Sequence, residues 1–470
     1  MDTAYVDDEK MWYVPKALLI AEHNLDPIFR ATGIPEEMQI SEERQHPWFR
    51  AYISDFVHPP LFYEILAFFY LLFGYSNILT HIIIVLISIF AAFMTYLLGS
   101  YLYNERVGFG ASLLLVFSPI FFSQAGRAYP DMLTAALGIT AIYFALRDKT
   151  YLYILFGSLL VLTRETGILF IISILIYKSV IDYKHKKKLF NSLFQYGFPI
   201  LIMIFWYLYH YIKTGLFIYG QNVSQQATIN QLLINILTYT KFLLVYQYRI
   251  ILVLTIIFVL YKYNKTSFNK KTLPLILTII FIIVFYGWAN IMYLRHILPI
   301  FPLFFILATN SLEQILRKKQ LLFGLAILVL IILFTTQWFS STKLYHEENM
   351  RYLDVINTRE QAQLFILENP ESKFWVDGFY YYDLVYPFVG FVDKPLTNIE
   401  IIPTEYIHKE NTYYHPTNFS NNFKSGDYVL DSKLVMHEIR GDYQIIQSLN
   451  LELVKEIESH DEFMNIYRII

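Results

Sequence analysis

An almost continuous apolar stretch from about residue 78 to residue 339 constrains this chain more than any other feature. Short charged loops divide the stretch into segments, and a helix needs about 20 apolar residues to cross the hydrocarbon core of a bilayer. Over the whole sequence, 56% of residues are apolar and only 16% are charged, whereas typical soluble domains contain about 25% charged residues. The sequence therefore predicts an integral membrane protein.

Segment lengths predict about ten membrane-spanning helices in this chain. We expect them at 78–101, 107–125, 131–147, 189–212, 246–263, 272–290, 296–313 and 320–339, with two more inside 151–181. The segment 151–181 is counted as two short spans because the sequence Arg-Glu-Thr-Gly at 164–167 interrupts it. Residues 58–74 are apolar but too short to span comfortably, so a half-inserted or interfacial helix is expected there.

The Lys and Arg residues of the short loops predict the orientation of the chain, because such residues accumulate on the cytoplasmic side. With the N-terminus outside, the inner loops hold fourteen Lys and Arg residues and the outer loops hold four. The N-terminal tail, the loops at 126–130 and 290–295, the turn at 164–167 and the C-terminal region are thus predicted to lie outside.

Polarity divides the chain into three parts. Residues 1–57 are acidic and form a predicted outer loop, 58–339 form the membrane core, and 340–470 form a soluble extracytoplasmic domain. In the last part a helical pattern at 358–369 precedes strand-like runs at 373–379, 427–431, 443–449, 451–457 and 463–470, which is typical of an α/β or α+β domain. Asn-X-Ser triplets at 222–224 and 418–420 match the pattern of glycan acceptors.

Net charge and cysteine content exclude several functions. The net charge of −2 provides no general attraction for nucleic acid. The chain contains no cysteine, which excludes disulfides, thiolate metal sites and thiol catalysis. Ionisable residues near membrane depth are costly, so those at the ends of the predicted spans are the first candidates for function.

Two of these candidates lie at the acidic N-terminus, and others flank apolar segments. Asp8 and Glu9 have a simple explanation as part of a solvated tail, and His58 precedes two prolines that mark the start of a helix. Arg295 and His296 open a predicted span, where an arginine commonly extends its guanidinium to the interface.

Two further pairs of charged residues lie close to span ends. Asp131 opens a span four residues after Arg127, and an acid at that position complements the helix dipole. Arg164 and Glu165 interrupt an apolar run, and a mutual ion pair is the structural explanation. Each signal is weak alone, but the orientation places all of them on the outer face. Carboxylates accept protons from hydroxyl groups, and guanidiniums bind phosphate, so together they favour transfer of a group from a lipid phosphate.

The order of these motifs resembles the GT-C membrane glycosyltransferases. Asp-Glu near the N-terminus is followed by HPPLFY, SPIFFSQAGRAYPD, LTRETG and YLRHILPIFP, within residues 5–312. The sequence is most similar to the branch of dolichyl-phosphate-mannose–protein mannosyltransferases and aminoarabinose transferases, which is glycosyltransferase family 39 and its relatives. The WWDYG motif of the metal-dependent oligosaccharyltransferases is absent, and FWVDGFYYYD does not match it.

This resemblance implies an inverting transfer of a sugar from a polyprenyl or dolichyl monophosphate to a hydroxyl acceptor, without a metal or other cofactor. The lipid-linked sugar is a substrate. Asp8 would be the general base, Asp131 a second acid near the donor or the acceptor, and Arg164 and Arg295 ligands of the phosphate. The remaining predicted site residues are Glu9 beside the base, Arg127 at the phosphate, and His58, Glu165 and His296 lining the cavity.

The N-terminus departs from the family pattern. Relatives begin with a span before the Asp-Glu loop, whereas here only six residues precede Asp7. The missing span would raise the number to eleven and place the N-terminus inside, which suggests a shortened or misassigned start.

Three other interpretations stay open. They are a lipid or sugar transporter, a membrane glycan polymerase or ligase that uses a diphosphate-linked chain, and an inactive scaffold. No internal repeat of the kind found in many transporters is visible. The sequence specifies neither the sugar nor whether the acceptor is a protein, a lipid or a glycan, and a cell membrane is the expected location.

Overall fold

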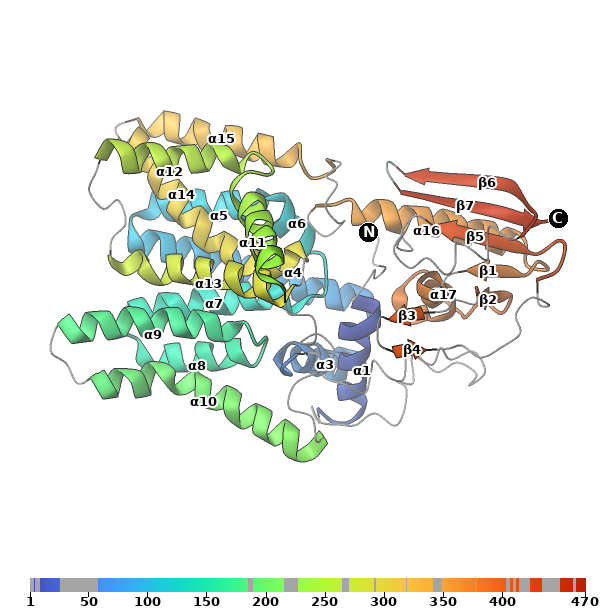
Figure 1. Ribbon diagram of the computed structural model, residues 1–470, viewed down its shortest axis with the longest axis horizontal. Coiled ribbons are helices and arrows are strands. Elements are labelled where there is room, and N and C mark those ends of the chain that lie inside the picture. Colours follow the sequence, from blue (N-terminus) through green and yellow to red (C-terminus); the bar gives the residue numbers. More distant parts are fainter. Residues whose placement is uncertain are drawn as a thin grey trace.

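The computed structural model describes residues 4, 9–25, 58–184, 189–214, 227–263, 270–290, 293–317, 319–340, 349–376, 378–402, 406–408, 411–413, 423–432, 449–459 and 462–470. Helices of the membrane part lie side by side, and a smaller part with a β-sheet lies beyond one end of them (Figure 1). Between the two lie the short η1 (Glu9–Tyr13), α1 (Val14–Glu22) and α3 (Leu61–Phe73).

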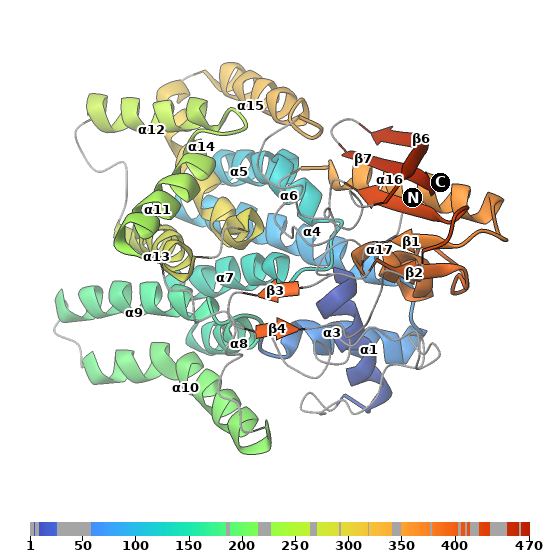
Figure 2. The ribbon, with the colours of Figure 1, turned by 45° about the vertical axis from the view of Figure 1, so that its right-hand side comes forward.

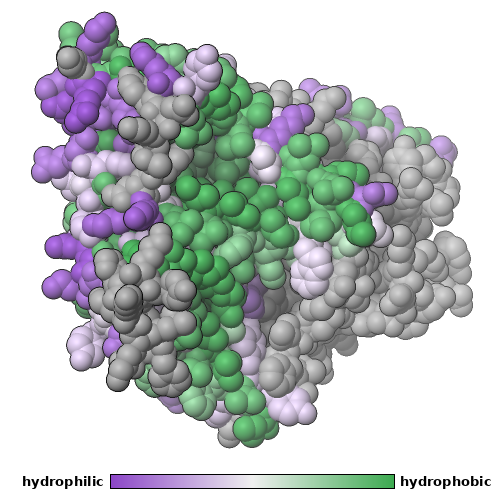
Figure 3. All heavy atoms as spheres, turned by 60° about the vertical axis from the view of Figure 1, so that its left-hand side comes forward, coloured by the Kyte–Doolittle hydropathy of each residue, from purple (hydrophilic) through white to green (hydrophobic). Residues whose placement is uncertain are grey.

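The membrane part contains most of the helices. They are α4 (Asn77–Leu102), α5 (Glu105–Phe117), α6 (Pro119–Gln124), α7 (Pro130–Leu146), α8 (Thr150–Val161), α9 (Gly167–Lys184), α10 (Leu189–Thr214), α11 (Ile229–Leu244), α12 (Arg249–Tyr263), η4 (Lys270–Thr272), α13 (Leu273–Ala289), η5 (Leu294–Ile300), α14 (Phe301–Leu316) and α15 (Gln320–Thr335). Their outer surface carries a broad band of hydrophobic side chains, bordered on one side by hydrophilic ones (Figure 3). This pattern fits contact with lipid.

Length and composition qualify four of the described helical segments as membrane spans: Asn77–Leu102, Leu193–Ile212, Lys270–Ala289 and Leu294–Leu316. A fifth is added if α11 and α12, which are bent by 91°, count as one. Shorter apolar helices include Leu61–Phe73, which agrees with the expectation that 58–74 does not span comfortably. The prediction of a polytopic helical membrane protein is confirmed, and the number ten stays a prediction.

Breaks in the helices follow from local sequence. The predicted span 107–125 is divided, because Ser118 precedes Pro119 and takes an extended conformation that ends α5. The predicted interruption at 164–167 is present, since α8 ends at Val161 and α9 begins at Gly167. The bend between α11 and α12 contains Gln247 and Tyr248, both with positive φ.

The C-terminal part combines helices with a mixed sheet, as predicted. It contains α16 (Tyr352–Glu368), β1 (Phe374–Val376), α17 (Gly378–Val385), η7 (Pro387–Val389), β2 (Ile399–Ile401), β3 (Tyr406–His408), β4 (Asn411–Tyr413), β5 (Tyr428–Ser432), β6 (Leu451–Ser459) and β7 (Glu462–Ile469). The five-stranded sheet has the order β2-β1-β5-β7-β6, with β1 parallel to β2 and β5 and the other pairs antiparallel. Most of the predicted strand at 443–449 lies outside the described residues, as do both Asn-X-Ser triplets.

Specific contacts join the C-terminal part to one end of the helices. The hydroxyl of Tyr75 donates a hydrogen bond to the carbonyl of Phe388 at 2.6 Å. The backbone nitrogen of Met350, just before α16, donates to the carbonyl of Trp338 at 2.8 Å, and the Trp338 ring stacks on Phe122 with centroids 3.9 Å apart. Figure 2 shows α1 and α3 beside this junction.

Candidate active site

Four segments that are distant in the sequence meet at the end of the helices that faces the C-terminal part. They are η1, the segment from α6 to the start of α7, the turn between α8 and α9, and η5 (Figures 1 and 2). The predicted site residues that the structure describes belong to these segments or lie next to them. Eight of the nine are described, whereas Asp8 lies outside the described residues.

Glu9 connects η1 to the segment before α7. Its Oε1 accepts a hydrogen bond from the backbone nitrogen of Ala128 at 2.5 Å, and its Oε2 lies 3.2 Å from Nε of Arg127. Arg127 is fully buried and also donates to the hydroxyl of Tyr129 at 2.7 Å. Because the carboxylate bonds to both main chain and side chain, Glu9 is held firmly at the start of the segment that leads to α7.

Asp131 forms the second charged centre. It lies in the first turn of α7, is fully buried, and accepts a hydrogen bond from Nη1 of Arg164 through Oδ1. Its Oδ2 lies 3.9 Å from Nε of Arg295, which comes from η5. Two guanidiniums therefore share one carboxylate, and this small cluster carries an excess positive charge.

Tyr129 joins the two charged centres. The guanidinium carbon of Arg295 lies 4.2 Å from the centroid of its ring, and that of Arg127 lies 4.7 Å from the same centroid. Tyr13 of η1 packs edge-on against this ring at 5.6 Å. A cation near an aromatic face is stabilised by the ring quadrupole, so Tyr129 helps to keep the arginines close together without removing their charge.

A histidine–carboxylate pair lies beside these arginines. Nδ1 of His58 is 3.0 Å from Oε2 of Glu165, and both side chains are partly exposed, at 14% and 31%. Burial raises the pKa of Glu165, but the neighbouring His58, the backbone and Arg164 more than offset this effect, so the pKa is lowered. Glu165 is therefore ionised at neutral pH.

His296 completes the group of predicted residues. Its ring stacks on Tyr286 of α13 with centroids 4.9 Å apart, and it is close enough to Arg164, Arg295 and His58 to interact with them electrostatically. Its Nδ1 is buried and has no hydrogen-bond partner among the described residues. An acceptor or donor on a bound molecule would satisfy this atom.

Sequence reasoning missed the aromatic residues of the site, because tyrosine and phenylalanine occur throughout the chain. Tyr129 and Tyr286 contact the arginines, and Tyr239 of α11 is near both Arg164 and Arg295. The only available signal for Tyr129 was its place between Arg127 and Asp131 in the motif.

Within the residues described, no group of three or more His, Asp or Glu side chains could hold a metal ion.

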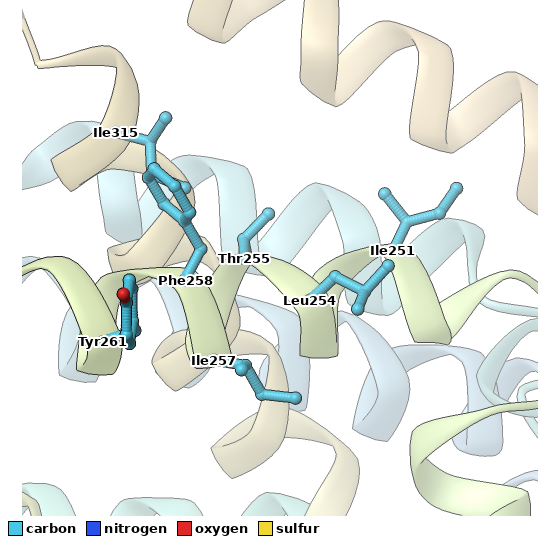
Figure 4. A pocket seen from close by; sticks show the side chains of 7 residues that line it. All are labelled: Ile251, Leu254, Thr255, Ile257, Phe258, Tyr261 and Ile315. Atoms are coloured by element: carbon cyan, nitrogen blue, oxygen red, sulfur yellow. The ribbon is translucent and has the colours of Figure 1, made fainter.

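A hollow of about 610 Å³ lies away from this site, between α12 and Ile315 of α14 (Figure 4). Its walls are apolar apart from Thr255 and the Tyr261 hydroxyl, and Thr255 donates to the carbonyl of Leu252. Such a surface suits hydrocarbon chains and offers no group for chemistry.

Comparison with known proteins identifies the architecture. Residues 57–210 match the family model of dolichyl-phosphate-mannose-protein mannosyltransferase. The crystal structure of ArnT from Cupriavidus metallidurans in the apo state is similar over 99% of this chain and 94% of that chain, with a TM-score of 0.57 and 13% identity. The resemblance to the GT-C membrane glycosyltransferases is confirmed. The family match over residues 57–210 supports the prediction of a membrane glycosyltransferase.

A second ArnT structure from the same organism, bound to undecaprenyl phosphate, is similar over 99% of this chain and 95% of that chain, with a TM-score of 0.54 and 12% identity. No curated protein matches the sequence. The family match includes His58, Arg127, Asp131, Arg164 and Glu165 but neither Glu9 nor Arg295. The roles of individual residues therefore stay predictions.

Proposed function

We propose that this glycosyltransferase moves a sugar from a polyprenyl monophosphate to a hydroxyl acceptor at the extracytoplasmic face of a cell membrane. The pair of guanidiniums that shares Asp131 carries the proposal, because it places cationic hydrogen-bond donors suited to a phosphate at one end of apolar helices. A lipid phosphate lies at this depth when its isoprenoid chain stays in the bilayer. The similarity to ArnT, which has been crystallised with undecaprenyl phosphate, supports this class of donor.

In the proposed reaction, the acceptor hydroxyl attacks the anomeric carbon while the bond from that carbon to the phosphate oxygen breaks. The polyprenyl phosphate leaves with the bonding electrons, and the hydroxyl proton passes to a carboxylate. Arg164 and Arg295 stabilise the negative charge that develops on the phosphate. One displacement of this kind inverts the anomeric centre, as the resemblance to the family implies.

Asp8 is the residue we propose as the base. The described carboxylates have other partners: Glu9 binds Arg127 and Ala128, and Asp131 binds Arg164. Asp8 directly precedes Glu9 in the sequence, and Glu9 is anchored close to the arginine cluster. We propose that Arg127, whose charge Glu9 balances, positions this segment, while His58, Glu165 and His296 line the cavity.

Substitution of the base tests the proposal. Asp8→Asn should abolish sugar transfer in proteoliposomes supplied with a polyprenyl-monophosphate sugar, while the protein still folds in detergent. Asp7→Asn is the matched control, since it makes the same change one residue away, and it should retain transfer within about threefold. Near-normal turnover by Asp8→Asn would refute the assignment of the base.

Donor and transport assays separate the other functions. Transfer from a diphosphate-linked glycan, with none from a monophosphate sugar, would indicate a polymerase or ligase. Movement of the lipid-linked sugar across the bilayer without transfer would indicate a transporter. Absence of both from the wild-type protein would favour an inactive scaffold.

A further inference from the structure

A buried ionic cluster connects η1 to the C-terminal part. Nζ of Lys10 pairs with Oδ1 of Asp383 in α17, and Oδ2 of the same carboxylate pairs with Nη1 of Arg359 in α16. The side chains of Lys10 and Asp383 are fully buried, and that of Arg359 is 6% exposed. Lys10 is 373 residues from Asp383 in the sequence, so this contact depends wholly on the packing of the two parts.

Successive residues of η1 thus contact different parts of the protein. Glu9 binds Arg127 and Ala128 next to the membrane helices, whereas Lys10 binds Asp383 of the C-terminal part. The segment that follows Asp8 is held between the two. Tyr352, at the start of α16, strengthens this junction, because its ring lies 5.2 Å from the guanidinium carbon of Arg127.

The cost of burying charge makes this arrangement specific. An unpaired buried charge is strongly unfavourable, so Lys10 cannot move away from Asp383 without losing a partner in a region that excludes water. An apolar contact would tolerate a small sliding motion, but an ion pair with hydrogen-bond geometry tolerates much less. The position of η1 is therefore set by the C-terminal part as well as by the helices.

We infer that Asp383 is a positioning residue for the reaction: the C-terminal domain, through the Lys10–Asp383 pair, holds the segment that carries the proposed base. The inference rests on the proposed function, in which Asp8 accepts the proton. It assigns the C-terminal domain a part in turnover that requires no contact with the sugar.

Substitution of the two cations that pair with Asp383 tests the inference. Lys10→Met removes the connection to η1 but leaves the Asp383–Arg359 pair, whereas Arg359→Met leaves the Lys10–Asp383 pair. Both exchange one cation for an unbranched apolar side chain. Misplacement of a reacting group by about 1 Å can cost on the order of 10²-fold in rate, so Lys10→Met should lower kcat by about 10- to 100-fold. Its KM for the donor should stay within about threefold, because the phosphate-binding arginines are unchanged.

Hydrogen–deuterium exchange of residues 9–22 provides a readout that does not depend on activity. Lys10→Met should speed exchange in this segment, and Arg359→Met should leave both exchange and kcat close to those of the wild type. Equal losses of kcat in the two variants, or an unchanged kcat in Lys10→Met, would overturn the inference. If the wild-type protein transferred no sugar, the proposed function would fail, and the exchange data alone would decide whether the connection holds η1.

A charge-preserving variant covers the case in which Lys10→Met does not fold. Asp383→Glu keeps the ion pairs and lengthens the side chain by one methylene. It should lower kcat without raising the KM for the donor, and a wild-type kcat in this variant would also overturn the inference.

Discussion

Replacing Asp131 by asparagine should destabilise the protein strongly, since this change keeps the shape of the side chain but removes the charge that two arginines share. Nε of Arg295 lies 3.9 Å from Asp131, and opposite charges at such a distance attract by about 4 kcal/mol at an effective dielectric constant of about 20. Arg164, which is hydrogen-bonded to the same carboxylate, adds a comparable attraction. Removing one partner from a buried pair typically costs about 3–5 kcal/mol, and we expect Asp131→Asn to lower the free energy of unfolding by this amount.

Equilibrium unfolding in mixed micelles with sodium dodecyl sulfate, followed by the fluorescence of the six tryptophans, measures this loss. The control is Glu400→Gln, because Glu400 pairs with Lys373 at 3.3 Å and both side chains are exposed, at 54% and 39%. That variant should lose less than about 1 kcal/mol. In Asp131→Asn the guanidiniums of Arg164 and Arg295 repel each other without a carboxylate between them. The double variant Asp131→Asn/Arg164→Gln removes one of these two charges, so it should recover about half of the stability that Asp131→Asn loses. If Asp131→Asn were no less stable than Glu400→Gln, the shared carboxylate would not hold the arginines together.

Three further predictions concern the donor, pH and helix packing. Arg164→Ala should raise the KM for the lipid-linked donor more than that for the acceptor and lower kcat by about 10²–10³-fold; a kinetic series in both substrates that showed the reverse would contradict its role at the phosphate. The pKa of Glu165 is lower in the folded protein than in the unfolded chain, where it is about 4.5. Ionisation of this carboxylate therefore stabilises the folded protein above about pH 4.5, and this stabilisation is lost as the pH falls through the folded pKa. Glu165→Gln should therefore lose less thermal stability than the wild type as the pH falls below about 4.5, and equal losses would show that this carboxylate is not responsible. Gly138→Ala should cost about 1–3 kcal/mol, because the added methyl would lie 2.5 Å from the ring of Phe170, whereas Gly324→Ala, with no atom within 4 Å, should be neutral or slightly stabilising in the same unfolding assay.

The membrane part could largely be anticipated from the sequence, because apolar length and costly charges leave few alternatives. The interruption at 164–167 was predictable for this reason. Ser118–Pro119 also contained a recognisable helix break, but the apolar character of 107–125 outweighed it in our prediction. The orientation of the helices across the membrane rests on the loop charges alone.

Pairing within the site was much less predictable. A mutual pair between Arg164 and Glu165 was the structural explanation for that motif, yet their partners are Asp131 and His58. Arg295 was explained as a side chain that reaches the interface, yet it is 2% exposed. Residues adjacent in sequence point to different neighbours in a turn, and partners from distant segments cannot be identified without the packing. The Lys10–Asp383 contact is the extreme case, because neither residue carries a motif.

The separation of Lys10 from Asp383 also has a consequence for biosynthesis. The partner of Lys10 emerges 373 residues later, which takes about 20–75 s at roughly 5–20 residues per second. During this time the lysine must remain solvated or pair with a temporary partner, while the intervening membrane helices are already being inserted. A product that terminates before α17 would contain every arginine of the site but could never bury this cation. Burial of Lys10 against Asp383 therefore requires a chain whose translation has passed α17.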